Sequence, residues 1–124
     1  MTQAAAKPSL SEAKLAQYTG TEQWHRHSLL RSILYTDGVK YVAETAGAYW
    51  PMDDIAFSQT DPLIRAEEFQ VWNLGVRPDS IGTLTCEDGN GRVVTRRDYS
   101  FTSFPEPGID LWFEGGIIYP PSAH

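Results

Sequence analysis

The stretch IGTLTCEDGNGRVVTRRDYSF, residues 81–101, has the pattern of a β-hairpin. Before the loop, threonines alternate with Leu84 and Cys86, which is the two-residue period of a strand with one covered face. The loop at residues 87–91, EDGNG, contains glycines and an asparagine that tolerate the positive φ of hairpin turns. Centring this loop predicts that Cys86 lies opposite Val93. We therefore expect strands over residues 81–86 and 92–101, with one shared face made of Leu84, Cys86, Val93, Tyr99 and Phe101.

Strand signals continue on both sides of this hairpin. Residues 69–76 alternate apolar side chains between two faces, as a strand covered on both sides does. Residues 109–114 and 117–119 are separated by Gly115-Gly116, a dipeptide typical of tight turns. The pairs expected in this second hairpin are Phe113 with Ile118 and Trp112 with Tyr119.

The beginning of the chain has helical signals instead. Ser9 and Glu12 have the spacing of a capping box, which predicts a helix over residues 10–18. Residues 21–35 fit either a short helix or an extended connection, and both alternatives stay open. The first nine residues contain no such pattern and are expected to form a flexible tail.

Two more helices are predicted in the first half of the chain. Thr36 or Asp37 caps one that ends at Gly47, and Pro51 stands in the first turn of a short third helix. Helices first and strands afterwards indicate an α+β fold. We expect N-terminal helices packed on one face of a C-terminal antiparallel sheet of about four or five strands. The domain organisation expected is a tail over residues 1–9 and a single α+β domain over residues 10–121.

Length and composition are those of one globular domain in a reducing compartment. The chain has 124 residues, of which 41% are hydrophobic, and one core suffices for this length. Cys86 is the single cysteine, which excludes an intramolecular disulfide and is typical of cytoplasmic proteins. Because no apolar stretch approaches the roughly 20 residues of a membrane helix, we expect a soluble cytoplasmic protein without membrane contacts.

The net charge of −6 is concentrated in the middle of the chain. Residues 42–89 carry nine acidic and two basic side chains, whereas the rest of the chain is nearly balanced. The ten basic residues are scattered, which disfavours direct binding to DNA or RNA. An acidic surface suits a basic protein partner instead. The sequence leaves open whether the chain also forms a homodimer.

Four sequence blocks carry a resemblance to a known family. They are GTEQWHRH (residues 20–27), YTDGVKYVAETAGAYW (35–50), EFQVW (68–72) and LTCEDGNG (84–91). In this order and spacing they resemble an uncharacterised family of small bacterial proteins, a domain of unknown function also found on phages and plasmids. The similarity runs from about Leu15 to Tyr119. It implies no known activity and no catalytic residues, but it implies that the protein is encoded on a mobile element. Small acidic proteins of mobile elements often inhibit host defence.

The sequence contains no complete motif for a metal, calcium or catalytic site. His25 and His27 have a spacing at which two imidazoles of an extended segment can share a metal, but the sequence positions no third ligand. The loop at residues 87–91 lacks the later glutamate of a calcium loop. The chain contains no G-x-S-x-G, no H-E-x-x-H and no glycine-rich phosphate loop. We therefore expect no enzyme, no catalytic residues, no metal and no cofactor.

These observations favour a phage or mobile-element protein that binds a host protein with a basic surface and blocks it. The target class is a CRISPR-type or other nucleic-acid-handling defence complex, which makes the chain an anti-defence (anti-CRISPR) inhibitor. An alternative is a small-ligand or nucleotide-sequestering protein that holds phosphate with Arg92, Arg96, Arg97 and the two histidines. A small enzyme is a third hypothesis. The residues predicted to bind the partner are Asp53, Asp54, Glu67 and Glu68, with Tyr49 and Trp50 as aromatic anchors.

Overall fold

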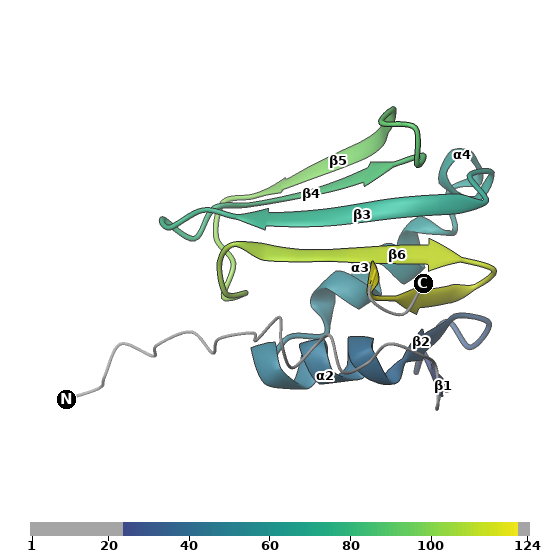
Figure 1. The fold of residues 1–124 in the computed structure, drawn as a ribbon, viewed down its shortest axis with the longest axis horizontal. Coiled ribbons are helices and arrows are strands. Elements are labelled where there is room, and N and C mark those ends of the chain that lie inside the picture. Colours follow the sequence, from purple (N-terminus) through teal and green to yellow (C-terminus); the bar gives the residue numbers. More distant parts are fainter. Residues whose placement is uncertain (1–23, 122–124) are drawn as a thin grey trace.

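The computed structural model of the protein describes residues 24–121 (Figure 1). The predicted tail at residues 1–9 and the predicted helix at residues 10–18 lie outside the described residues. In chain order the elements are β1 (Trp24–Arg26), β2 (Leu34–Thr36), α2 (Asp37–Ala46), α3 (Trp50–Ser58), α4 (Pro62–Arg65), β3 (Phe69–Val76), β4 (Gly82–Glu87), β5 (Val93–Tyr99), β6 (Gly108–Glu114) and β7 (Ile117–Tyr119).

The seven strands form one mixed sheet in the order β1-β2-β7-β6-β3-β4-β5. Neighbouring strands are antiparallel except β2 and β7, which are parallel. The predicted α+β arrangement, with N-terminal helices on a C-terminal antiparallel sheet of four or five strands, is therefore wrong. The described helices are short and lie in the middle of the chain, between the first two strands and the last five.

For residues 24–35, the described part of the range left open between a helix and an extended connection, the strands β1 and β2 show the extended alternative. Each has three residues, which is too short for an alternating pattern to show in the sequence. Their pairing depends on tertiary contacts: β1 pairs with β2, and β2 joins the sheet beside β7 with Leu34 opposite Ile117. Because β2 and β7 are more than 80 residues apart in the chain, no local signal announces this contact.

The helices predicted at α2 and α3 are confirmed. α2 ends at Gly47, whose φ of 67° is left-handed and whose N–H caps the carbonyls of Ala43 and Glu44. Its apolar stripe is buried, and the helix contacts β1, β2 and β7. α3 begins with Trp50 and Pro51, as expected for a proline in the first turn. Within residues 24–121, no helix has the length and apolarity required to cross a bilayer.

The β4–β5 hairpin forms, but its register differs from the prediction. Cys86 lies opposite Thr95 instead of Val93, because the ladder has a bulge between Cys86 and Glu87. The cause is Asp88, whose carboxylate accepts the backbone N–H groups of Asn90 and Arg92 and so closes a wider loop. Leu84, Cys86 and Tyr99 therefore face the helices as predicted, whereas Val93 and Phe101 are exposed.

The second predicted hairpin is confirmed with its register. β6 and β7 pair Phe113 with Ile118 and Trp112 with Tyr119. Phe113 and Ile118 face the helices, and Trp112 and Tyr119 lie on the opposite face of the sheet in edge-to-face contact. The hairpin therefore places Phe113 in the core, close to the β6–β7 turn.

The core lies between the sheet and the helices α2 and α3. Val42 of α2, Met52 of α3 and Leu111 of β6 line a common void of about 10 Å³, so these three elements pack almost without gaps. Each fully buried aliphatic side chain of this kind stabilises the fold by about 1.5–3 kcal/mol. Trp72, Leu74 and Leu84 continue this core across β3 and β4.

Candidate functional site

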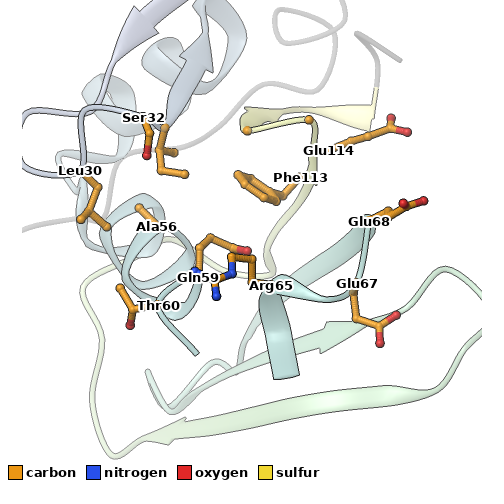
Figure 2. A pocket seen from close by; sticks show the side chains of 13 residues that line it. Leu30, Ser32, Ala56, Gln59, Thr60, Arg65, Glu67, Glu68, Phe113 and Glu114 are labelled. Atoms are coloured by element: carbon orange, nitrogen blue, oxygen red, sulfur yellow. The ribbon is translucent and has the colours of Figure 1, made fainter. Parts of the chain in front are cut away.

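A groove of about 760 Å³ opens at one end of the sheet (Figure 2). Three parts of the chain form it: the loop before β2, the end of α3 with the segment from α4 to β3, and the β6–β7 turn. Its volume is within the range of about 300–1,000 Å³ that ligand sites usually have. The sequence places these three parts far from one another, and the fold brings them together.

His27 organises the first wall of the groove. Its backbone N–H donates to the carbonyl of Ile33 at 2.8 Å, and its Nδ1 accepts the N–H groups of Leu29 and Leu30 at 3.2 and 3.0 Å. The side chain is buried, and its Nε2 lies 2.7 Å from Oδ1 of Asp53. An Nδ1 that accepts two N–H groups carries no proton, so the ring proton is on Nε2, which donates a hydrogen bond to Oδ1 of Asp53. The loop is therefore folded around one imidazole.

A buried amide pair supports the second wall. Gln59 and Gln70 exchange two side-chain hydrogen bonds of 2.8 and 2.9 Å, and the indole of Trp72 donates to Gln70 at 2.9 Å. The Gln70 amide also donates to the carbonyls of Ile64 and Glu67. Because all of these groups are paired away from water, they fix the turn between α4 and β3. This turn holds Glu67 at the edge of the groove.

Three glutamates lie at one end of the groove: Glu67, Glu68 and Glu114 (Figure 2). Glu67 accepts a hydrogen bond from Arg92 at 2.9 Å. Glu114 accepts a hydrogen bond from the neutral hydroxyl of Tyr119. Burial, followed by the Glu114 carboxylate, raises the pKa of Tyr119 to about 12. Among residues 24–121, Glu68 has no ion-pair partner and is exposed.

The other end of the groove is apolar. Leu30 and Ala56 lie there, on the side opposite the glutamates, and the ring of Phe113 lies between the two ends (Figure 2). Ile33 adds a further aliphatic side chain to the lining. Arg65 is the basic side chain of the lining and lies beside Gln59 (Figure 2). The groove is therefore polarised, with carboxylates at one end and hydrocarbon at the other.

Of the six residues predicted to bind a partner, Glu67 and Glu68 line the groove. Asp53 bonds to His27 and lies one helical turn before the groove residue Ala56. The structure places the other three elsewhere. Asp54 faces β5, where it accepts a hydrogen bond from Tyr99 and pairs with Arg97 at 3.4 Å. The ring of Trp50 packs on Tyr99 with centroids 4.8 Å apart, and Tyr49 is exposed at the start of α3.

The histidines and arginines considered for a metal or phosphate site face carboxylates. His25 lies 2.7 Å from Asp37, and His27 bonds to Asp53, so the two imidazoles have different partners. Arg92 pairs with Glu67 and Asp88, Arg96 with Asp98, and Arg97 with Asp54. In the part of the chain that the structure describes, no three His, Cys, Asp or Glu side chains come close enough to hold a metal ion.

Sequence reasoning missed Leu30, Ile33, Ala56, Phe113 and Glu114 as groove residues. Phe113 was assigned its correct strand partner, and Ala56 its correct helix, but neither pattern says what lies across the groove. That relationship depends on the parallel contact of β2 with β7, where the N–H of Leu34 also donates to the carbonyl of Gly116. Only a three-dimensional arrangement carries this information.

One comparison with known proteins identifies a family. The model of a family of unknown function, DUF6876, matches residues 9–124, and the chain belongs to this family. The resemblance to an uncharacterised family is thereby confirmed. No curated protein and no solved structure matches the chain.

Proposed function

We propose that this member of the DUF6876 family is a protein-binding domain that takes a basic part of a host protein into the groove and blocks it. One observation carries the proposal: the three glutamates of the groove lie next to an apolar lining. Carboxylates alone are an ordinary solvated surface, whereas an adjacent apolar recess offers area that a partner can bury. Acidic groups at its edge speed the encounter with a basic partner and make binding depend on salt.

The partner class follows from charge. Proteins that handle nucleic acids present basic surfaces to phosphate, and an acidic domain that occupies such a surface competes with the nucleic acid. The proposal therefore keeps an anti-defence role against a CRISPR-type or other nucleic-acid-handling complex of the host. In this role the protein is carried by a phage or mobile element, acts in the cytoplasm and works without turnover.

Glu67 and Glu68 are the centre of the proposed contact. Asp53 extends it along α3, because it lies one turn from Ala56 and its side chain is 47% exposed. Asp54 and Trp50 stay in the proposal as an outer contact on the β5 side of α3, and Tyr49 stays as an exposed anchor beside Glu44 of α2. Arg92 is bound to Glu67 and Asp88, so the alternative of a phosphate ligand held by the arginines gains no support from the contacts.

The test uses the purified chain as bait in an extract of the host cell, followed by purification of any captured protein. We expect the captured protein to have a basic surface and to lose its nucleic-acid binding at about one equivalent of the chain. Added salt should weaken the complex, because the contact is between exposed charges. Inhibition by far less than one equivalent would indicate turnover and would contradict the proposal. So would a complex that is indifferent to salt.

A further inference from the structure

The two ends of the groove differ in chemistry, and this difference restricts what can occupy it. A uniformly basic segment would fill only the end with Glu67, Glu68 and Glu114. A uniformly apolar segment would cover these carboxylates without pairing them, which costs free energy. The complementary occupant has both features side by side.

The charges of the lining point in the same direction. The lining contains three acidic side chains and one basic side chain, Arg65. Arg92 pairs with Glu67 but shares its one positive charge with Asp88, and Glu114 is bonded to a neutral hydroxyl. Glu68 has no cation beside it among residues 24–121. A lysine or arginine of an occupant is the group that would complete this end of the groove.

The apolar end of the groove is complementary to a bulky apolar side chain of the occupant. Ile33 and Phe113 are each 7% exposed and line the groove, so their small accessible edges form its inner surface, whereas Ala56 lies fully buried behind it. Leu30 is partly exposed and closes this end from the outside. A leucine- or phenylalanine-sized side chain inserted here would leave water, and this removal of apolar surface from water favours binding.

We infer that the groove holds a short segment of the partner in which a bulky apolar residue stands next to a lysine or arginine. The apolar residue contacts Leu30 and Phe113, and the cation pairs with Glu68. This inference rests on the proposed function and specifies the chemistry of its partner. It fixes the orientation of the segment, with its apolar part toward α3 and its basic part toward the start of β3.

Synthetic peptides test this inference without knowledge of the partner. One peptide contains two leucines followed by two lysines between glycines, a second has glutamates in place of the lysines, and a third has serines in place of the leucines. Each is titrated to millimolar concentration into the isotope-labelled full chain and followed by NMR. We expect the leucine–lysine peptide to shift the backbone resonances of Leu30, Gly115 and Gly116 at lower concentration than either control peptide. Both control peptides should bind at least about tenfold more weakly than the leucine–lysine peptide, a difference of about 1.4 kcal/mol in binding free energy.

A pair of variants locates the peptide. Thr60 is exposed and lines the groove, so Thr60→Trp fills part of it and should weaken the leucine–lysine peptide about tenfold. Thr85→Trp adds the same side chain on the face of the sheet away from the helices, where Thr85 pairs with Asn73, and should leave the affinity unchanged. Folding of each variant is checked by its NMR spectrum.

The outcomes separate this inference from the proposed function. Equal binding of the acidic and basic peptides, or no effect of Thr60→Trp, would overturn the inference. If the full chain still binds and blocks a basic host protein in that case, the proposed function stands and its contact lies outside the groove. If the peptide binds as expected but no host protein is blocked, the groove assignment stands and the inhibitory function falls.

Discussion

The Nε2 of His27 lies 2.7 Å from Oδ1 of Asp53, and this contact joins the loop before β2 to α3. The same imidazole accepts the N–H groups of Leu29 and Leu30 through Nδ1. One side chain that is 3% exposed thus satisfies two backbone donors and fixes the wall that carries Leu30 into the groove. From the sequence, His27 was considered as a metal ligand. In the structure it is instead a buried residue that holds the loop before β2 in place.

Removing this imidazole is expected to destabilise the fold and loosen the groove. His27→Ala leaves a cavity and two unpaired backbone donors, and should lower the free energy of unfolding by about 2–4 kcal/mol. His27→Asn keeps a side-chain oxygen near the position of Nδ1 and should lower it by about half as much. Urea unfolding of the two variants measures the difference. Equal losses in both variants would show that the Nδ1 contacts contribute nothing.

Gly108 is expected to tolerate no side chain. Its φ is 105°, and a Cβ built on it would lie 1.7 Å from the carbonyl oxygen of Leu74, which is backbone and cannot move aside. Gly91 has a similar φ of 89° but nothing within 4 Å of such a Cβ. Gly91→Ala should therefore cost about 1 kcal/mol through backbone strain alone, and Gly108→Ala several times more.

Thermal unfolding of these two alanine variants checks the comparison. A melting temperature of Gly108→Ala within about 2 °C of that of Gly91→Ala would contradict the close approach of β6 to β3, because 1 kcal/mol corresponds to roughly 2–8 °C in small domains. The measurement thereby tests the pairing of Gly75 with Gly108, where β6 begins.

Cys86 is expected to be unreactive in the folded protein. Burial, followed by the carboxylate of Glu67, raises the pKa of its thiol to about 12, so almost no thiolate exists at pH 8. The unfolded thiol ionises near its ordinary value. The stability that the protonated thiol contributes is therefore complete below about pH 8.5 and is lost as the pH rises toward 12.

A thiol reagent that absorbs on reaction measures this property, because the chain has one cysteine and the signal has one source. At pH 8 the native protein should react at least about a hundredfold more slowly than the protein in urea, since the thiolate and not the thiol is the nucleophile. Reaction at similar rates in both states would show that Cys86 is accessible on β4 and not part of the core.

The elements with strong local signals were predictable from the sequence. Gly115-Gly116 between two apolar stretches defined the β6–β7 hairpin and its register, and Gly47 marked the end of α2. The β4–β5 hairpin was predicted with the wrong register, because the side chain of Asp88 widens its loop and a bulge absorbs the extra residue. Loop chemistry of this kind depends on a side chain's choice of partner, which residue type alone does not fix.

The arrangement of the elements was not predictable in the same way. β1 and β2 are each three residues long, and β2 gains its stability from β7 at the other end of the chain. The same contact builds the groove. Of the four acidic residues predicted to bind a partner, Glu67 and Glu68 line the groove, whereas Asp54 is bound to Arg97 and Tyr99; the third groove carboxylate, Glu114, was not predicted. Internal pairing of this kind is invisible in a list of charges.

The most direct measurement compares the affinities of two charge-reversal variants for the host protein that the chain captures. Glu68→Lys places a cation in the acidic end of the groove, and Glu106→Lys makes the same change in the exposed loop before β6. By titration calorimetry at low salt, Glu68→Lys should weaken binding by about tenfold or more, which is about 1.4 kcal/mol. Glu106→Lys should stay within about twofold of the parent, since Glu106 lies outside the groove and outside the outer contact. Equal affinities of the parent and Glu68→Lys would contradict the groove as the binding site.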